Sequence, residues 1–418
     1  MFLERLELVD FRGYAHARVE LGPGVRVFVG ANAQGKTNLL EAVHYLAIGA
    51  SHRVASDVPL IRRVAGGSAA DAPSEVGPAE AEAIAAVIRA VARVGAVGPV
   101  DPAADRGRRL TVELELRPSG RNRARVNDQP QPRIRDAIGQ MRSVLFAPED
   151  VGLVRGDPSD RRRFLDELLA QRRPAYLAAR QEYERVLRQR NALLRAMRAG
   201  GEAAGATLAT WTEALVNAGA TLIAARIAAV HALAGPVAEA YADLVVGSPE
   251  REAAADVALA YELSTSRVVP AEPSAGVPDP AALAEELAKG LAAVAPAERE
   301  RGITLAGPHR DELQLSLNGL PARGYASHGE TWSLALALRL ASREVLGEVG
   351  EEPVVLLDDV FAELDERRRA RLAARCASFQ QVLVTAAVDD DVPLAGPRHR
   401  VEAGTITTNP VAAGREGW

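Results

Sequence analysis

The chain has 418 residues, of which 48% are hydrophobic and 25% charged, a composition typical of a globular protein with more than one domain. Its single cysteine, Cys376, excludes an internal disulfide framework, and the charged start MFLERLELVD predicts no secretory signal. No uncharged apolar run reaches the ~18 residues of a membrane span, so we expect a cytoplasmic protein without a membrane partner.

The first 150 residues alternate strands with turn residues. The predicted strands are FLERLELVDF, AHARVEL, VRVFVG, LTVELELRP, ARVND and SVLFAP. A helix is predicted after VRVFVG, with Leu39, Leu40, Val43 and Leu46 on one face. Gly66–Glu80 is rich in Ala, Gly and Pro and is interpreted as a flexible insertion.

The pattern then becomes helical over Asp160–Gly200 and Thr207–Leu233, which are separated by Gly200-Gly201. A helix of ~40 residues spans at most ~60 Å, so no long coiled coil is expected. Another helix is predicted at ALAEELAKGLAAV, and the later strands are LQLSL, PVVLLDD and QVLVTA. The unalternating Val354–Leu357 predicts a parallel strand buried on both faces.

An apolar strand and a helix flank a stretch that fits G-x-x-x-x-G-K-[ST], the pattern of a phosphate-binding loop. Its residues are Gly30, Ala31, Asn32, Ala33, Gln34, Gly35, Lys36 and Thr37. The backbone N–H groups of such a loop surround a β-phosphate, while the Lys36 ammonium reaches the β- and γ-phosphates and the Thr37 hydroxyl ligates Mg²⁺. Lys36 is one of only two lysines in a chain with 50 basic residues, so a compact ammonium is retained where arginine is otherwise used. We therefore expect ATP and Mg²⁺ as cofactors.

The strand VVLLDD places two acids where parallel strands bind ligands, at the carboxyl end. Asp358 is predicted to hold the Mg²⁺ and Asp359 to orient an attacking water, so both are candidate catalytic residues. Ser327 and Gly329 open the helix that begins before TWSLALALRLAS and could form a second anion site at its N-terminus. The alternative is an ordinary capping box between Ser327 and Glu330.

Basic stretches interrupt an acidic chain whose net charge is −5. Seven arginines stand against two acids between positions 117 and 142, and twelve against six between 155 and 198. Such stretches are typical of a surface that binds a polyanion such as DNA, although solvated helix faces have the same pattern. The candidate contacts are Arg121, Arg123, Arg161, Arg162 and Arg163.

Two α/β parts separated by helices predict one ATPase head split by an inserted domain. The expected fold class is α/β, a mixed sheet with flanking helices and a mainly helical insert. The expected parts are residues 1–158 with the phosphate loop, 159–300 as the helical domain, 301–404 with the signature Ser327–Glu330 and the acidic strand, and 405–418 as a tail.

The order of these features resembles the ABC-type ATPase heads of SMC-like proteins, and more closely the RecF family of bacterial recombination and gap-repair proteins. The residues that carry the resemblance are Asp10–Tyr14, Leu40–Ala42, Ser51–Arg53, Phe146–Asp150, Arg161–Asp166, Gly307–Asp311 and Ala362–Asp365. They extend over nearly the whole chain.

The resemblance implies an ATP-dependent homodimer in which Ser327 and Gly329 of one copy face the γ-phosphate bound by the other. It also implies slow ATP hydrolysis, binding to single- and double-stranded DNA at gaps or junctions, and recombination mediator proteins as partners. This sequence departs from related heads in having Glu330 where the signature usually ends in Gln, and Thr385 where many ABC ATPases have His. The alternatives are another SMC-like ATPase and, less in keeping with the late signature, a transporter nucleotide-binding subunit.

Overall fold

The computed structural model describes residues 1–62, 85–95, 107–200, 205–245, 256–272, 276–348 and 350–409. Its contacts group the chain into two compact units, one of Met1–Pro148 with Gly350–Trp418 and one of Glu149–Val349. Each unit is described by itself. The insertion predicted at Gly66–Glu80 lies outside the described residues.

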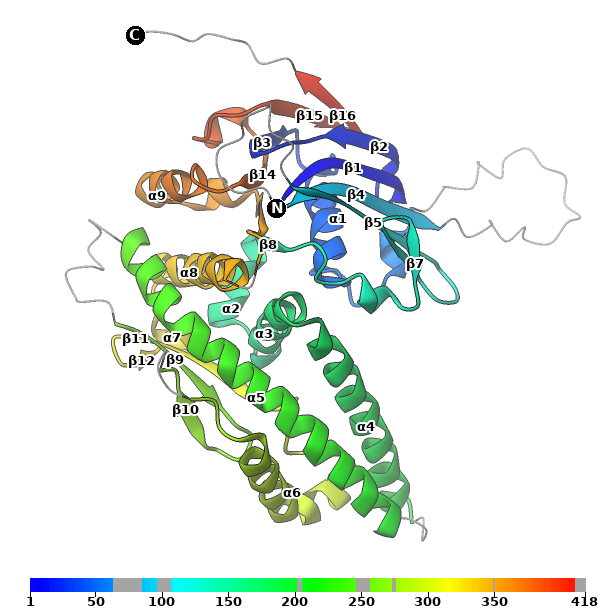
Figure 1. The fold of residues 1–418 in the computed structure, drawn as a ribbon. Coiled ribbons are helices and arrows are strands. Elements are labelled where there is room, and N and C mark those ends of the chain that lie inside the picture. Colours follow the sequence, from blue (N-terminus) through cyan, green and yellow to red (C-terminus); the bar gives the residue numbers. More distant parts are fainter. Residues whose placement is uncertain are drawn as a thin grey trace, which may run out of the picture. The chain divides into compact units, whose positions relative to one another are not determined.

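The first unit contains a six-stranded antiparallel sheet (Figure 1). In sheet order its strands are β2 (Tyr14–Glu20), β1 (Phe2–Phe11), β4 (Ala86–Val94), β5 (Arg108–Leu116), β6 (Arg123–Val126) and β7 (Gln129–Gln131). The predicted alternation is present in β5, where Leu110, Val112 and Leu114 are buried and the residues between them are half-buried. One face of this sheet therefore belongs to the core.

A second six-stranded sheet in the same unit is parallel except at one edge. In order its strands are β16 (Thr405–Asn409), β15 (Arg398–Glu402), β3 (Gly24–Val29), β14 (Gln381–Ala386), β13 (Val354–Asp358) and β8 (Ser143–Phe146). Every residue of β13 and β14 is buried. For Val354–Leu357 of β13 the unalternating sequence predicted this burial.

The tail expected from residue 405 is a strand up to Asn409. A turn with positive φ at Ala403 (47°) and Gly404 (75°) reverses the chain, and β16 then pairs with β15. Thr405–Asn409 was not predicted as a strand because its sequence, TITTN, does not by itself indicate one. Pairing with β15 makes this segment a strand.

The core of this unit lies around helix α1 (Lys36–Ile48), which contacts strands of both sheets. One buried apolar cluster joins the helix to β5 in the antiparallel sheet and to β13 and β14 in the parallel sheet. Its members include Leu39, Val43, Val112, Leu356 and Leu383. The last helix of the unit is α9 (Glu366–Cys376).

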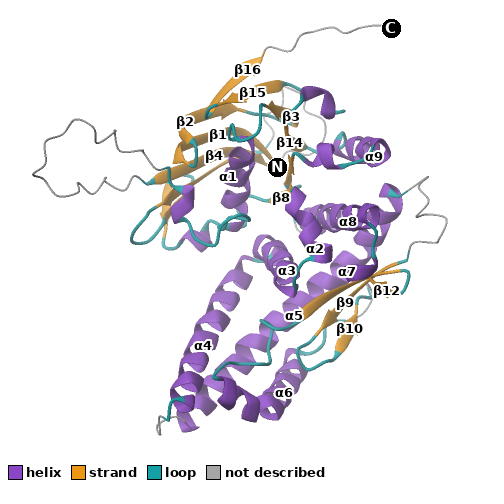
Figure 2. Ribbon diagram, turned by 180° about the vertical axis from the view of Figure 1, so that it is seen from behind, coloured by secondary structure: helices purple, strands orange, loops and turns teal. Residues whose placement is uncertain are grey.

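The second unit is mainly helical (Figure 2). Its helices are α2 (Val151–Arg155), α3 (Pro158–Arg172), α4 (Pro174–Arg198), α5 (Gly205–Leu244), α6 (Pro280–Arg301), α7 (Ala322–Tyr325) and α8 (His328–Gly347). The helical pattern predicted over Asp160–Gly200 is two helices, because Pro174 begins a new helix after the extended residue Arg173. The 40 residues of α5 span about 60 Å, and no long coiled coil is present among the described residues.

By length and composition alone, Thr207–Leu244 of α5 could cross a membrane, with a mean hydropathy of 1.5. However, 61% of its most apolar window is buried inside the protein, and α5 contacts α4, α6 and α8. Such burial against neighbouring helices is typical of the core helix of a helical unit.

A four-stranded antiparallel sheet completes the second unit. In order its strands are β10 (Val268–Pro270), β9 (Val257–Glu262), β11 (Glu312–Leu317) and β12 (Leu320–Pro321). Because β11 pairs with β9 and α8 packs along α5, residues 301–349 group with the helical unit. The division observed at 148/149 and 349/350 therefore differs from the boundaries expected at 158/159 and 300/301.

Candidate nucleotide-binding site

The predicted phosphate loop joins β3 to α1 in the first unit, and its glycines meet local requirements. Gly35 has a φ of 111°, and a Cβ at Gly30 would lie 2.2 Å from the carbonyl oxygen of Val401. The Tyr14 hydroxyl donates to the carbonyl oxygen of Gly35 at 2.9 Å. The loop is thus held in shape by its neighbours, as a preformed phosphate cradle requires.

The hairpin between β15 and β16 holds the same loop from another side. The backbone N–H of Ala403 donates to Gln34 Oε1 at 2.7 Å, and that of Gly404 donates to the Gln34 carbonyl oxygen at 3.3 Å. Neither contact was expected, since this part of the chain was interpreted as the end of the head and a tail.

Lys36 lies within the loop and is 4% exposed. Its ammonium donates to the carbonyl oxygens of Gly30 at 2.8 Å and Ala31 at 3.2 Å, and lies 3.9 Å from Asp359 Oδ2. An ammonium in this place can exchange carbonyl partners for phosphate oxygens without leaving the loop.

The acidic strand end lies beside the first turn of α1. The Thr37 hydroxyl donates to Asp358 Oδ1 at 3.1 Å, although the two residues are 321 positions apart. A hydroxyl and a buried carboxylate at this separation fit Mg²⁺, which takes one or two protein oxygens and completes its shell with water and phosphate. In the described part of the chain no group of three or more His, Cys, Asp and Glu side chains could hold a metal alone.

Thr385, at the end of β14, connects the two acids. Its hydroxyl donates to Asp358 Oδ1 at 2.6 Å and accepts from the backbone N–H of Asp359 at 3.0 Å. Asp359 has a φ of 50°, an unusual conformation for a residue other than glycine. Thr385 thus orients both acids at the position where many ABC ATPases have His.

We expect Thr385→Val to lower the rate of ATP hydrolysis by roughly tenfold or more, because the Asp359 backbone N–H loses its Thr385 partner and the buried Asp358 carboxylate loses one of its partners, at a cost of about 1–3 kcal/mol each. Affinity for ATP should change little. Steady-state kinetics separate the two effects, and Thr385→Ser should restore the rate. Equal rates in Thr385→Val and the wild type would rule out this orienting role.

Two sequence features that carried the resemblance meet at Glu41 of α1. Arg12 donates to both Glu41 carboxylate oxygens, at 2.9 and 2.8 Å, and the Ser51 hydroxyl donates at 2.5 Å. Burial would raise the pKa of Glu41, but these hydrogen bonds outweigh it and hold that pKa below its ordinary value. Arg53 donates to Asn38 Oδ1 at 3.1 Å, so it lies close to the first turn of α1.

The predicted signature opens α8 in the second unit. Ser327 Oγ accepts from the Glu330 backbone N–H at 3.2 Å, and Glu330 Oε2 accepts from the Ser327 backbone N–H at 2.8 Å. The capping box proposed as the alternative is therefore present. It leaves the Ser327 hydroxyl proton able to donate to an anion, and it turns the Glu330 carboxylate back onto the backbone.

The candidate polyanion contacts differ in what already surrounds them. Arg161 is 4% exposed and forms a bidentate pair with Glu312 at 2.7 and 2.9 Å, so it is a structural residue. Arg162 is half-buried and donates to the carbonyl oxygen of Asp311 at 2.8 Å. Arg163 is exposed but its Nη2 lies 3.4 Å from Asp160 Oδ1, whereas Arg121 and Arg123 are exposed in the first unit.

Known proteins resemble this chain over nearly its whole length. Residues 2–401 match the family model described as RecF/RecN/SMC N terminal domain. The DNA replication and repair protein RecF of Streptomyces avermitilis is 49% identical over 413 residues, and that of Frankia alni is 48% identical over 412 residues. Each alignment covers 97% of this chain and 99% of the relative. The chain belongs to the RecF family.

Solved RecF structures share the whole fold. The recombination mediator protein RecF in the RecFOR pathway, with ATPγS, is 26% identical with a TM-score of 0.81, and covers 97% of this chain and 98% of its own. The same mediator with ATP is 25% identical with a TM-score of 0.80, covering 98% of each chain. An Smc head bound to the C-winged helix domain of ScpA is 15% identical with a TM-score of 0.50 and covers 99% of this chain and 98% of its own, which indicates the fold alone.

These matches confirm the predicted family and the predicted fold class, an α/β ATPase head with a helical insert. The two solved RecF structures are described with ATPγS and with ATP.

Proposed function

We propose that this protein binds ATP and Mg²⁺ at the phosphate loop, dimerises in the ATP-bound state and binds DNA during recombinational gap repair in the cytoplasm. The observation that carries the proposal is the contact of Thr37 with Asp358, which brings a phosphate-loop hydroxyl and an acidic strand end together. RecF family membership and the RecF structures described with ATP support it.

In the proposed site, the loop backbone and Lys36 bind the phosphates, and Thr37 and Asp358 would hold the metal. Bound Mg²⁺ would neutralise phosphate charge. Asp359, whose side chain is partly exposed, is placed to orient an attacking water. Hydrolysis is proposed to be slow and to serve release of the dimer from DNA.

The remaining ligand of the γ-phosphate is proposed to come from a second copy. Ser327 and Gly329 of one copy would donate to the γ-phosphate bound by the other, giving a two-fold symmetric dimer with two composite sites. ADP lacks that phosphate and should not support the dimer. The proposed macromolecular partners are single- and double-stranded DNA at gaps or junctions and recombination mediator proteins.

Filter binding to gapped DNA, with ATP, with ADP and without nucleotide, tests the proposal. ATP with Mg²⁺ should increase the amount of DNA retained. Retention that is the same under all three conditions would contradict an ATP-dependent DNA-binding function.

We expect Asp359→Asn to slow hydrolysis by roughly 10²-fold, because an amide is a poor acceptor for the proton of an attacking water. ATP affinity should stay near that of the wild type, and the dimer should persist longer after ATP is added. Single-turnover hydrolysis measures the first effect. If the variant hydrolyses ATP at the wild-type rate, Asp359 does not have this role.

A further inference from the structure

The turn Gly307–Asp311 in the second unit is fixed along its backbone. The Arg310 N–H donates to the Gly307 carbonyl oxygen at 2.8 Å, and the Gly307 N–H donates to Ser264 Oγ at 2.7 Å. A Cβ at Gly307 would lie 2.5 Å from the Tyr183 hydroxyl, and its φ is 131°. The turn therefore has one conformation that its surroundings allow.

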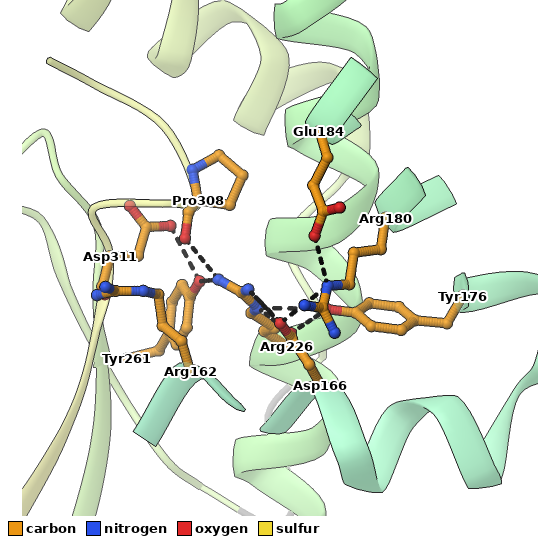
Figure 3. Close-up of polar contacts among 9 residues, drawn as sticks. All are labelled: Arg162, Asp166, Tyr176, Arg180, Glu184, Arg226, Tyr261, Pro308 and Asp311. Atoms are coloured by element: carbon orange, nitrogen blue, oxygen red, sulfur yellow. Dashed lines mark hydrogen bonds and ion pairs between the residues drawn. The ribbon is translucent and has the colours of Figure 1, made fainter. Parts of the chain in front are cut away.

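A buried polar network fixes the same turn through hydrogen bonds to Pro308 and Asp311 (Figure 3). Arg226 donates to both carboxylate oxygens of Asp166, at 3.0 and 3.1 Å, and to the carbonyl oxygen of Pro308 at 2.6 Å. Asp311 accepts from the Tyr261 hydroxyl at 3.0 Å and from the Ser264 backbone N–H at 2.7 Å. Helices α3 and α5 and strand β9 thus all contribute to the position of the turn.

The charges of this network compensate one another. The side chains drawn in Figure 3 include three arginines and three acids: Arg162, Arg180, Arg226, Asp166, Glu184 and Asp311. Removing one partner of a buried ion pair leaves the other charge buried and uncompensated, so such a network favours a single arrangement. Here that arrangement fixes a surface turn.

His309 adds no charge to the turn. Its Nδ1 lies 2.7 Å from the Tyr183 hydroxyl and its Nε2 lies 3.2 Å from the Thr304 carbonyl oxygen, so Nε2 carries the proton and Nδ1 accepts. Burial lowers the pKa of His309 to about 4, which leaves the ring neutral at pH 7. Arg310 is then the solvent-exposed cation of the turn.

Arg310 is exposed, and within the described residues no ion pair or side-chain hydrogen bond engages its guanidinium. This sets it apart from Arg161, Arg162 and Arg226, which are all bonded inside the unit. A guanidinium on a fixed backbone loses less conformational freedom on binding than one on a mobile loop. Its planar fork matches the oxygens of a phosphate group.

We propose that Arg310 is a DNA-phosphate contact, presented by the fixed turn Gly307–Asp311. The proposal rests on the proposed DNA binding and deepens it by naming a contact residue. A nucleic-acid phosphate is favoured over a protein carboxylate because helix α4 of the same unit presents further exposed arginines, Arg188 and Arg195, whose guanidinium groups have no bonded partner among the described residues.

The test is the affinity for a labelled duplex with a single-strand gap, measured by fluorescence anisotropy with ATP and Mg²⁺ between roughly 50 and 200 mM salt. Arg310→Ala should weaken binding by roughly tenfold and reduce the slope of log affinity against log salt by about 0.9. Arg310→Lys should keep the slope and lose part of the affinity. Arg299→Ala is the matched control, since Arg299 is also exposed on this unit, on α6 and outside residues 155–198, without a bonded partner among the described residues.

The results of these measurements distinguish a failure of the proposed DNA binding from a failure of the proposed role of Arg310. Wild-type protein that does not bind the duplex overturns both. Wild-type binding with an Arg310→Ala variant of unchanged affinity and slope overturns only the role of Arg310, and would leave a protein partner as the reason for its exposure. An equal loss in Arg299→Ala would also overturn it, because any surface arginine of this unit would then have the same effect.

Discussion

Replacing Lys36 by arginine is expected to lower ATP affinity by roughly 100-fold, or about 2.8 kcal/mol, although the charge is kept. The Lys36 ammonium lies in a buried position with two carbonyl oxygens of the loop within 3.2 Å. A planar guanidinium is larger and cannot occupy that position without displacing the loop. Isothermal titration with ATP and Mg²⁺ measures the loss.

The chain offers a matched control in its other lysine. Lys289 is 74% exposed on α6 and pairs with Glu285. Lys289→Arg therefore makes the same chemical change at an exposed helix position outside the phosphate loop. The Lys289→Arg variant should bind ATP with the affinity of the wild type. Wild-type ATP affinity in Lys36→Arg would mean that Gly30–Thr37 is not a phosphate site of the proposed kind.

Ser327→Arg is expected to abolish ATP-dependent dimerisation while ATP affinity of the monomer stays within about threefold of the wild type. Ser327 is exposed at the start of α8, and the proposal uses it only on the nucleotide of a second copy. A long cationic side chain there would prevent the two copies from closing. Analytical ultracentrifugation with ATP measures the dimer.

Two further variants show whether the loss of dimerisation is specific to an arginine at position 327. Ser378→Arg adds the same side chain at another exposed serine and should dimerise normally. Ser327→Ala removes the hydroxyl and the helix cap, at a cost of about 1 kcal/mol in stability, and should weaken the dimer without abolishing it. A Ser327→Arg variant that still dimerises with ATP would exclude the trans contact.

The loop and the acidic strand end of the candidate nucleotide site could be predicted because each of them is a local sequence pattern. The glycines and Lys36 are adjacent in sequence, and Asp358 ends an apolar strand whose parallel neighbours share one edge. The contribution of Thr385 was missed, since the strand QVLVTA shows where the residue lies but not that β14 stands between β3 and β13. Strand order is decided by tertiary packing.

Other features could not be predicted from the pattern alone. Charge at Arg161 indicated a polyanion contact, yet its burial depends on Glu312, which lies 151 residues away. Likewise, the alternation in β11 predicts a half-buried strand but not that β9 is its partner. Periodicity specifies which face is buried, while the neighbour that buries it comes from the whole fold.

Multi-angle light scattering of the wild-type protein tests the central claim, that ATP joins two copies through composite sites. Mass is measured without nucleotide, with ATP and Mg²⁺, and with ADP and Mg²⁺. We predict a monomer of 44.3 kDa without nucleotide and with ADP, and twice that mass with ATP. A mass that does not depend on the nucleotide would contradict the account.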